Sequence, residues 1–218
     1  DIFSIPETMM PKIYPSDEIF GETDFDGILN EKLKICGVVG DSQGALFGQC
    51  CFESGCAKNT YGTGCFLLMH TGKRAIVSNH KLLTTIAAST DENIEYVLEG
   101  SVFTAGASVQ WLRDEMKMLK TVDESEYVAQ EVEDTDGVYM VPAFSGLGAP
   151  YWDAYARGTL LGLTRGSNRA HIVRAVLEAI AFQTYDVIRA MEADFGKSIV
   201  QLKVDGGASA NNFIMQFQ

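Results

Sequence analysis

The sequence predicts an α/β domain in which helices cover a sheet, and three observations lead to this prediction. Several short strand candidates follow one another between residues 56 and 99, which indicates an antiparallel meander. A long helix with an apolar face is expected over residues 169–193, and a further strand, 200–204, comes after it. Antiparallel strands followed by helix, strand and helix are typical of a layered α/β fold.

The composition is that of an ordinary globular protein and narrows the classes of partner. The chain has 218 residues, of which 46% are hydrophobic and 21% charged, so that a core can form. Lys and Arg total 17 against 29 Asp and Glu, a net charge of −12, which argues against nucleic acid as a partner. No apolar run approaches the length of a membrane span, so we expect no integral membrane segment.

The cysteines and histidines predict no metal site. The five cysteines match no zinc-binding spacing, and their apolar surroundings predict buried free thiols in a reducing cytoplasm. They are Cys36, Cys50, Cys51, Cys56 and Cys65. The three histidines are scattered, and we expect surface or capping roles for them. They are His70, His80 and His171.

The first half of the chain is expected to begin with a strand, a turn and a helix. Residues 35–40 are small or β-branched, which predicts a buried strand. Asp41 and Ser42 follow as residues typical of helix caps, and the helical pattern continues through 45–47. The meander then comprises the expected strands 56–60, 65–70, 83–88 and 95–99.

The second half alternates helices, strands and glycine-rich connections. A helix is expected over 103–120, and the acidic stretch 123–136 is expected to be a solvated surface helix or loop. Asn168 is placed to cap the long helix, and a last helix is expected to begin near Asn211. The other expected elements are strands 138–141 and 158–164 and a loop of glycines and aromatics at 145–153.

A glycine turn is the first candidate for a binding site. In Tyr61-Gly62-Thr63-Gly64, two glycines flank a threonine between two strand candidates. Such a turn presents backbone N–H groups and a hydroxyl with no side chain in the way, which suits a phosphate. The same pattern is more often only a hairpin connection, and both readings stay open.

Three other stretches could serve similar chemistry. The Asp41 carboxylate, at a strand-to-helix turn, could accept a proton from a hydroxyl or hold a metal, or only cap the helix. Small residues around Gly106, at the start of a helix, allow either the binding of an anion at the helix N-terminus or close packing of the helix. The run Asp205-Gly206-Gly207-Ala208 indicates either a nucleotide contact or a tight turn.

Taken together, these stretches resemble the glycerol kinases of the FGGY carbohydrate kinase family, within the actin, hexokinase and Hsp70 superfamily. The resemblance covers nearly the whole chain and is specific, because several multi-residue motifs occur in the same order. In this sequence they are Gly40-Asp41-Ser42-Gln43-Gly44, Asn59-Thr60-Tyr61-Gly62-Thr63-Gly64, Gly106-Ala107-Ser108, Gly146-Leu147-Gly148-Ala149-Pro150, Ala156-Arg157-Gly158 and Asp205-Gly206-Gly207.

The resemblance implies an actin-like ATPase (ribonuclease H-like) fold with two domains and a cleft between them. ATP would bind in the cleft with Mg²⁺, and a hydroxyl of glycerol would attack the γ-phosphate, giving glycerol 3-phosphate and ADP. Members of the family are much longer than this chain. We therefore expect a fragment with residues 1–50 from the end of domain I and 51–218 from domain II, which would need the missing N-terminal domain as a partner and show no turnover alone. A homo-oligomer is among the assemblies that the resemblance allows.

The resemblance also implies roles for ten residues. Asp41 would be the catalytic base, with an indirect role in holding Mg²⁺, while Ser42 and Phe66 would contact the polyol. The remaining residues would bind the nucleotide. Gly62 and Thr63 would contact its phosphates, and the others are Gly106, Gln110, Gly207, Ala208 and Asn211.

Two departures from the family pattern bear on specificity and regulation. Ser42 stands where the family often has a glutamine that contacts the polyol. Residues 26–34 lack the glycine-rich, arginine-containing loop through which some bacterial members bind fructose 1,6-bisphosphate. Two alternatives to a glycerol kinase stay open. They are a kinase for another polyol or ketose, and a non-catalytic nucleotide-binding fragment.

Overall fold

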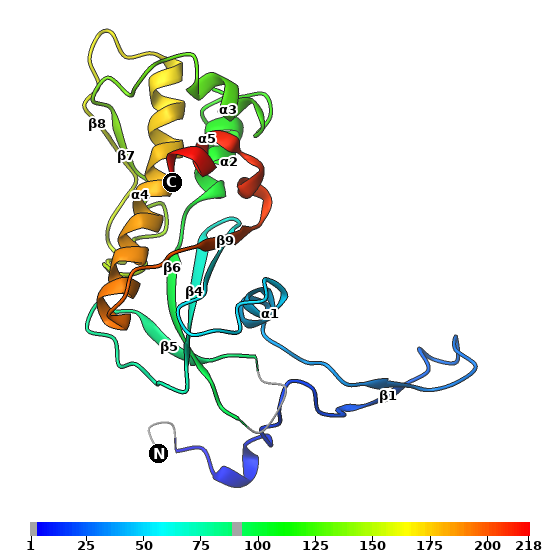
Figure 1. Cartoon of the computed structure of the whole chain (residues 1–218). Helices are drawn as coiled ribbons and strands as arrows, with labels where there is room; N and C mark the ends of the chain where they lie inside the picture. The colour runs from blue at the N-terminus through cyan, green and yellow to red at the C-terminus, as the bar shows by residue number, and fades with distance from the viewer. Residues whose placement is uncertain (1–3, 89–92) are drawn as a thin grey trace.

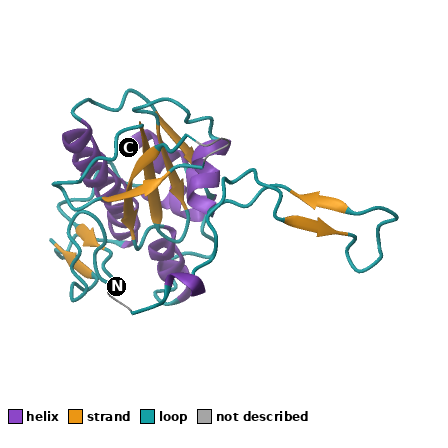
Figure 2. Cartoon of the chain, turned by 90° about the horizontal axis from the view of Figure 1, so that it is seen from below, coloured by secondary structure: helices purple, strands orange, loops and turns teal. Residues whose placement is uncertain are grey.

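A five-stranded sheet with helices on both faces forms the body of the protein, and a long arm projects from it (Figures 1 and 2). The computed structural model describes residues 4–88 and 93–218. The arm is a hairpin of β1 (Gly21–Thr23) and β2 (Leu33–Ile35), and the 3₁₀ turn η1 (Glu7–Met9) precedes it near the N-terminus. Within the described residues, no helix is both long and apolar enough to pass through a lipid bilayer.

The sheet is antiparallel except for one parallel strand. Strands β3 (Ala57–Tyr61), β4 (Cys65–Gly72), β5 (Leu83–Ile86) and β6 (Tyr96–Val102) pair antiparallel, as predicted, but the predicted meander was wrong in its order, because β6 pairs with both β4 and β5 and lies between them. The later strand β9 (Leu202–Asp205) pairs parallel with β3, so the sheet order is β5-β6-β4-β3-β9. This order places the end of β9 beside the end of β3, where the glycine turn follows.

The two faces of the sheet bury different helices, because successive side chains of a strand point to opposite faces. Helix α4 (Arg169–Phe195) covers the face that carries Leu67 and Met69, and it contributes more buried residues to the larger apolar cluster than any other described element. Helix α1 (Asp41–Gly48) covers the opposite face, where Leu46 packs with Leu68 in a smaller cluster. Helix α1, which begins with Asp41, therefore packs on the sheet whose strand β3 leads into the glycine turn.

Helix α4 begins at the predicted cap. The Asn168 side chain accepts hydrogen bonds from the backbone N–H groups of Ala170 (2.8 Å) and His171 (3.3 Å). The His171 ring Nδ1 in turn accepts from the Asn168 backbone N–H at 3.1 Å, which completes a capping box. The expected capping role of His171 is therefore confirmed.

The smaller elements gather beyond one end of the sheet. They are α2 (Gly106–Asp114), α3 (Glu124–Ala129), the hairpin of β7 (Tyr139–Val141) and β8 (Thr159–Leu161), the 3₁₀ turn η2 (Gly207–Ala210) and α5 (Asn212–Phe217). Asn211 caps α5 by accepting from the Ile214 backbone N–H at 3.0 Å, as its position before the helix predicts. Figure 1 shows α2, α3 and α5 side by side at this end.

Three element predictions were wrong in extent. The strand expected over 35–40 ends at Ile35, and Val38 beyond it is 54% exposed, because no described strand pairs with this segment. The helix expected over 103–120 is only α2, since Lys117 adopts a left-handed φ of 53° and the chain turns away. At α1 the cap is Gly40, and Asp41 is the first helical residue.

The predictions for His70 and for two cysteines were also wrong. His70 is buried, with its Nε2 atom 3.1 Å from Glu95 Oε2, because it lies inside strand β4. Cys36 is exposed in the arm, and Cys50 is exposed in the turn after α1. Cys51 and Cys65 are buried as expected.

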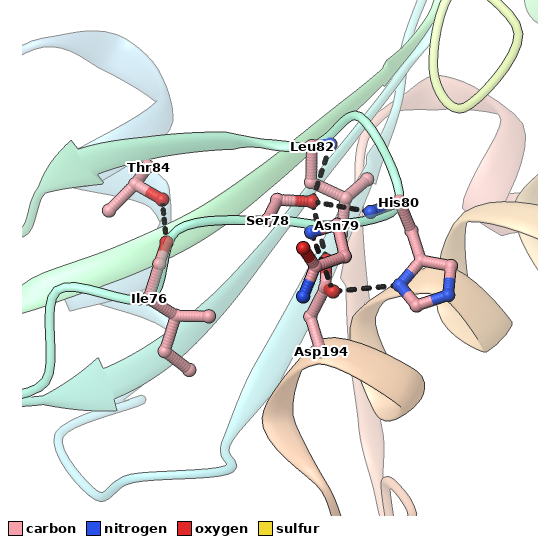
Figure 3. A network of polar contacts seen from close by, with 7 residues as sticks. All are labelled: Ile76, Ser78, Asn79, His80, Leu82, Thr84 and Asp194. Atoms are coloured by element: carbon pink, nitrogen blue, oxygen red, sulfur yellow. Dashed lines mark hydrogen bonds and ion pairs between the residues drawn. The ribbon is translucent and has the colours of Figure 1, made fainter.

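A buried carboxylate fastens the segment before β5 to the end of α4 (Figure 3). The Asp194 side chain is 1% exposed and accepts from the Ser78 hydroxyl and from the Asn79 backbone N–H at 3.0 Å. His80 Nδ1 lies 2.7 Å from its Oδ1 atom. Burial raises the pKa of Asp194, but the hydrogen bonds from Ser78, His80 and Asn79 outweigh it and bring the pKa below its ordinary value.

Asp194→Asn is expected to lower the free energy of unfolding by about 1.5–3 kcal/mol at neutral pH, because hydrogen bonds to a charged group are lost. Because the pKa of Asp194 is lower in the folded state than in the unfolded state, its ionised carboxylate stabilises the fold at pH values above the unfolded-state pKa. This stabilisation is lost as the pH falls through the folded-state pKa. The difference between wild type and variant should therefore shrink below about pH 4. Urea unfolding at several pH values measures it, and the exposed Glu133→Gln serves as control. Equal stability of Asp194→Asn and wild type at neutral pH would contradict this assignment.

Candidate functional site

One cavity brings together all seven residues predicted to bind a nucleotide. It has a volume of about 760 Å³ and lies between the glycine turn and the elements α2, α3, η2 and α5. The predicted residues that line it are Gly62, Thr63, Gly106, Gln110, Gly207, Ala208 and Asn211. They come from three parts of the chain that are far apart in sequence.

The glycine turn closes the β3–β4 hairpin at one wall of this cavity. Tyr61 pairs with Cys65, and the Gly62 backbone N–H donates to the Gly64 carbonyl at 2.9 Å. A Cβ atom on Gly64 would lie 2.2 Å from the Val102 carbonyl oxygen, so only glycine fits. A Cβ on Gly62 would meet only the Gly64 carbonyl, at 3.8 Å. The hairpin reading left open by the sequence therefore holds, and the same turn also lines the cavity.

Gly64→Ala should destabilise the fold by about 3 kcal/mol, because the new methyl group overlaps a backbone carbonyl that cannot easily move. Gly62→Ala, two positions away, is the matched control and should change the free energy of unfolding by less than about 1 kcal/mol. Chemical denaturation of the two variants measures the contrast. Two variants of equal stability would show that the turn adapts to a side chain at either glycine.

The start of α2 packs directly on the glycine turn. The backbone N–H groups of Gly106 and Ala107 donate to the carbonyls of Gly62 (3.0 Å) and Thr63 (3.1 Å), and that of Ala105 also donates to Thr63 (2.8 Å). These N–H groups are therefore used within the protein and are not free for an anion. Of the two readings of this helix start, the structure supports close packing, and a Cβ on Gly106 would lie 2.6 Å from the Gly62 carbonyl oxygen.

The end of β9 forms a second wall of the cavity. Gly206 has a φ of 89°, and a Cβ there would lie 2.4 Å from the Tyr61 carbonyl oxygen, so the turn presses against β3. Next to it, Gly207 faces open space. The Asn211 amide also donates to Ser125 Oγ at 3.3 Å, which links α5 to α3.

A third wall was missed by the sequence analysis, which assigned the acidic stretch to a solvated surface. Ser125 and Val128 of α3 are buried, and the Glu126 carboxylate accepts from the Asn212 backbone N–H at 2.8 Å. The additional lining residues from this stretch are Asp123, Ser125, Glu126 and Tyr127. Ser125, Val128 and Ala129, at positions i, i+3 and i+4, form the helical pattern that could have revealed this buried face.

Asp41, Ser42 and Phe66 lie outside this cavity, on the α1 side of the sheet. The Asp41 carboxylate is exposed at the first residue of α1 and accepts from the Ser42 backbone N–H at 2.8 Å. Phe66 is 37% exposed on β4 and pairs with Thr60 of β3. Asp41 is therefore presented by helix α1, and Phe66 by the sheet that α1 covers.

A buried lysine lies on the same side. Lys58 is fully buried, and its Nζ donates to Thr60 Oγ1 (2.8 Å) and to the Phe66 carbonyl (3.2 Å). Burial lowers the pKa of Lys58, and the negative charges of Asp205, Glu99 and Asp41 act against that shift. Lys58 thus holds the segment that presents Phe66 and lies within the electrostatic field of Asp41.

Most of this chain matches one known protein family. Residues 57–218 match the sequence model of the FGGY family of carbohydrate kinases, C-terminal domain. The chain belongs to the FGGY family of carbohydrate kinases. The match spans β3 to α5 and so includes the glycine turn and every element that lines the cavity.

Curated FGGY kinases with similar sequences are named glycerol kinases. The glycerol kinase of Treponema denticola is 63% identical over 214 residues, covering 98% of this chain and 43% of that protein. That of Lachnoclostridium phytofermentans is 61% identical over 216 residues, covering 99% of this chain and 43% of that protein. The chain thus spans less than half the length of these relatives.

Solved structures of FGGY kinases share the fold. The Plasmodium falciparum glycerol kinase with ADP superposes with a TM-score of 0.86 at 40% identity, covering 96% of this chain and 42% of that one. A ligand-bound xylulose kinase from Lactobacillus acidophilus gives a TM-score of 0.83 at 24% identity, with coverage of 99% and 44%. These similarities confirm the predicted actin-like (ribonuclease H-like) fold class.

Proposed function

We propose that this chain is the nucleotide-binding part of an ATP-dependent glycerol kinase, which forms glycerol 3-phosphate and ADP. The observation that carries the proposal is the cavity of about 760 Å³ on which all seven predicted nucleotide residues converge. The similarity to the Plasmodium falciparum glycerol kinase, whose structure was solved with ADP, supports an adenine nucleotide as the ligand. The identities of about 60% to curated glycerol kinases support glycerol as the acceptor.

In this proposal different walls of the cavity bind different parts of the nucleotide. The Thr63 hydroxyl at the tip of the glycine turn contacts the terminal phosphates, with Gly62 beside it. Gly207 and Ala208 approach the adenosine, where the absence of large side chains lets the backbone come close. Gly106, Gln110 and Asn211 complete the contacts.

Asp41 is the proposed general base. Its carboxylate is exposed at the first residue of α1 and accepts a hydrogen bond from the Ser42 backbone N–H. A carboxylate beside the attacking hydroxyl removes its proton as the phosphoryl group is transferred. Ser42, which follows Asp41 in the chain, and Phe66, on the same side of the sheet, are the proposed polyol contacts.

The donor set fits a magnesium ion carried by the nucleotide. Among the described residues, no group of three or more His, Cys, Asp or Glu side chains is arranged to hold a metal. Mg²⁺ is commonly bound through one or two carboxylates together with substrate phosphates, and Asp41 is the carboxylate proposed to help hold it indirectly. When bound, the ion would neutralise charge on the transferred phosphates.

The proposal assigns the chain two parts of a longer enzyme. Residues 1–50 would belong to the end of the first kinase domain and residues 51–218 to the second, close to the start of the family match at residue 57. Because the chain spans 43–44% of its curated relatives, the remaining polyol contacts would come from an N-terminal domain. We place the enzyme in the cytoplasm, and a homo-oligomer stays a prediction.

Substrate-dependent ADP formation by the full-length protein tests the proposal. Glycerol, xylulose and gluconate are assayed in parallel, and glycerol is expected to give the highest kcat/KM. A preference for xylulose or gluconate by orders of magnitude would assign the protein to another kinase of the family. ATP binding without phosphorylation of any polyol would favour a non-catalytic nucleotide-binding protein. The 218-residue chain alone is expected to bind ATP without turnover.

A further inference from the structure

Two cysteine thiols face each other at the junction between α1 and β3. The Sγ atoms of Cys51 and Cys56 lie 2.7 Å apart, closer than in an ordinary contact between two thiols. Cys51 follows the turn after α1, and Cys56 directly precedes β3. The two residues therefore bracket the connection between the helix that carries Asp41 and the strand that leads to Thr63.

Backbone hydrogen bonds fix both ends of this six-residue connection. The Cys51 N–H donates to the Leu46 carbonyl at 3.1 Å, and the Cys56 N–H donates to the Glu53 carbonyl at 2.9 Å. The Cys56 carbonyl accepts from the His70 N–H at 2.9 Å. Because both ends are anchored, the sulfurs are held together by the fold, and a bond between them needs little movement of the chain.

The two thiols differ in their access to solvent. Cys51 is 2% exposed, packed with Leu46 and Leu68 in the smaller apolar cluster, whereas Cys56 is half-buried at its edge. Burial, followed by the hydrogen bond to Cys56, raises the pKa of Cys51 to about 12. A reagent in solution therefore reaches Cys56 first, and Cys51 is placed to attack the product.

We propose that Cys51 and Cys56 form a dithiol site that hydroperoxides convert into an intramolecular disulfide. In the first step the Cys56 thiolate attacks the terminal oxygen of the hydroperoxide, the S–O bond forms and the O–O bond breaks, so that Cys56 becomes a sulfenic acid. The other oxygen leaves as an alkoxide or hydroxide and takes up the proton released by the Cys56 thiol, giving an alcohol or water. In the second step Cys51 Sγ attacks Cys56 Sγ, and the sulfenic oxygen leaves as water with the thiol proton. The two sulfurs lose two electrons, which the O–O bond accepts.

The disulfide would fasten α1 to the sheet at a point that is already cross-linked by hydrogen bonds. Lys203 Nζ of β9 donates to the carbonyls of Gln49 (2.6 Å) and Cys50 (3.2 Å), directly before Cys51. A covalent bond between Cys51 and Cys56 would therefore join α1, β3 and β9 into one unit, and the oxidised protein should unfold at a higher Tm than the reduced protein.

Peptide mapping of the native protein after exposure to hydrogen peroxide tests this site. Tryptic cleavage after Lys34 and Lys58 yields one peptide with four cysteines, and further cleavage after Glu53 separates Cys51 from Cys56. We expect the two fragments to stay joined until dithiothreitol is added, in wild type and in the control Cys50→Ser. They should be separate in Cys56→Ser, which should also lose the redox-dependent shift in Tm.

Two results would overturn the proposal. Joined fragments in wild type that become separate in Cys50→Ser would assign the disulfide to Cys50 and Cys56. Fragments that are never joined would show that the pair does not react with peroxide. The readout is mass and Tm, so it is independent of whether the full-length protein phosphorylates glycerol.

Discussion

Replacing Asp41 by Asn in the full-length protein is expected to lower the rate of glycerol-dependent ADP formation by about 10²–10⁴-fold, the usual contribution of a general base. An asparagine keeps the shape of the side chain but cannot accept the proton of the attacking hydroxyl. The carboxylate is exposed, and among the described residues its hydrogen-bond donor is the neighbouring Ser42 N–H, so the fold should be unaffected. A coupled assay of ADP formation and a thermal melt together measure the two effects.

Asp26→Asn is the matched control for this variant. Asp26 is also exposed, and its left-handed φ of 56° suits asparagine as well as aspartate. Asp26→Asn is expected to leave both ADP formation and Tm unchanged. A wild-type rate in Asp41→Asn would remove Asp41 from the chemistry and leave the cavity as a nucleotide site with an unassigned base.

Gly206→Ala is expected to have the largest effect on stability, a loss of about 2–5 kcal/mol in the free energy of unfolding. An alanine at a φ of 89° is strained, and its methyl group would lie 2.4 Å from the Tyr61 carbonyl oxygen. Both effects act where β9 joins β3, so the parallel strand and the wall formed by η2 would be displaced. Chemical denaturation monitored by circular dichroism measures the loss.

The neighbouring glycine provides the control. A Cβ on Gly207 meets no atom within 4 Å, and its φ lies outside the left-handed region, so Gly207→Ala should change stability by less than about 1 kcal/mol. Because Gly207 lines the cavity, the same variant should bind ADP more weakly than wild type while staying folded. Equal stability of the two alanine variants would show that this turn tolerates side chains at either position.

The features predicted best from the sequence depend on local patterns. Asn168 and Asn211 stand directly before apolar helical repeats, and each caps the expected helix. Strands β3 and β4 are separated by a short turn, so their antiparallel pairing follows from their order along the chain, whereas the position of β6 between β4 and β5 does not. The residues of the candidate site were found through motif resemblance, and the structure brings seven of them around one cavity.

The features missed depend on contacts between distant segments. Residues 36–40 have the composition of a buried strand, but strand formation needs a paired strand, and among the described residues this segment has only the hydrogen bond from the Val38 N–H to the Ser16 carbonyl, at 2.9 Å. The helix expected from residue 103 begins only at Gly106, because strand β6 continues to Val102 and Ala105 has a non-helical backbone (φ −129°, ψ −94°) where it packs on the glycine turn. The role of α3 as a wall of the cavity depends on its contact with α5, 86 residues further on.

The cavity between the glycine turn and η2 is proposed to bind an adenine nucleotide, and an NMR titration of the ¹⁵N-labelled protein with ADP tests this most directly. The largest shifts are expected at the amides of Gly62, Thr63, Gly207 and Ala208. A second cavity of about 510 Å³ is lined by Phe47 of α1 together with Phe52 and His70. It provides an internal comparison. Shifts centred on Phe52 and His70 instead of the glycine turn, or no shifts at all, would contradict the account.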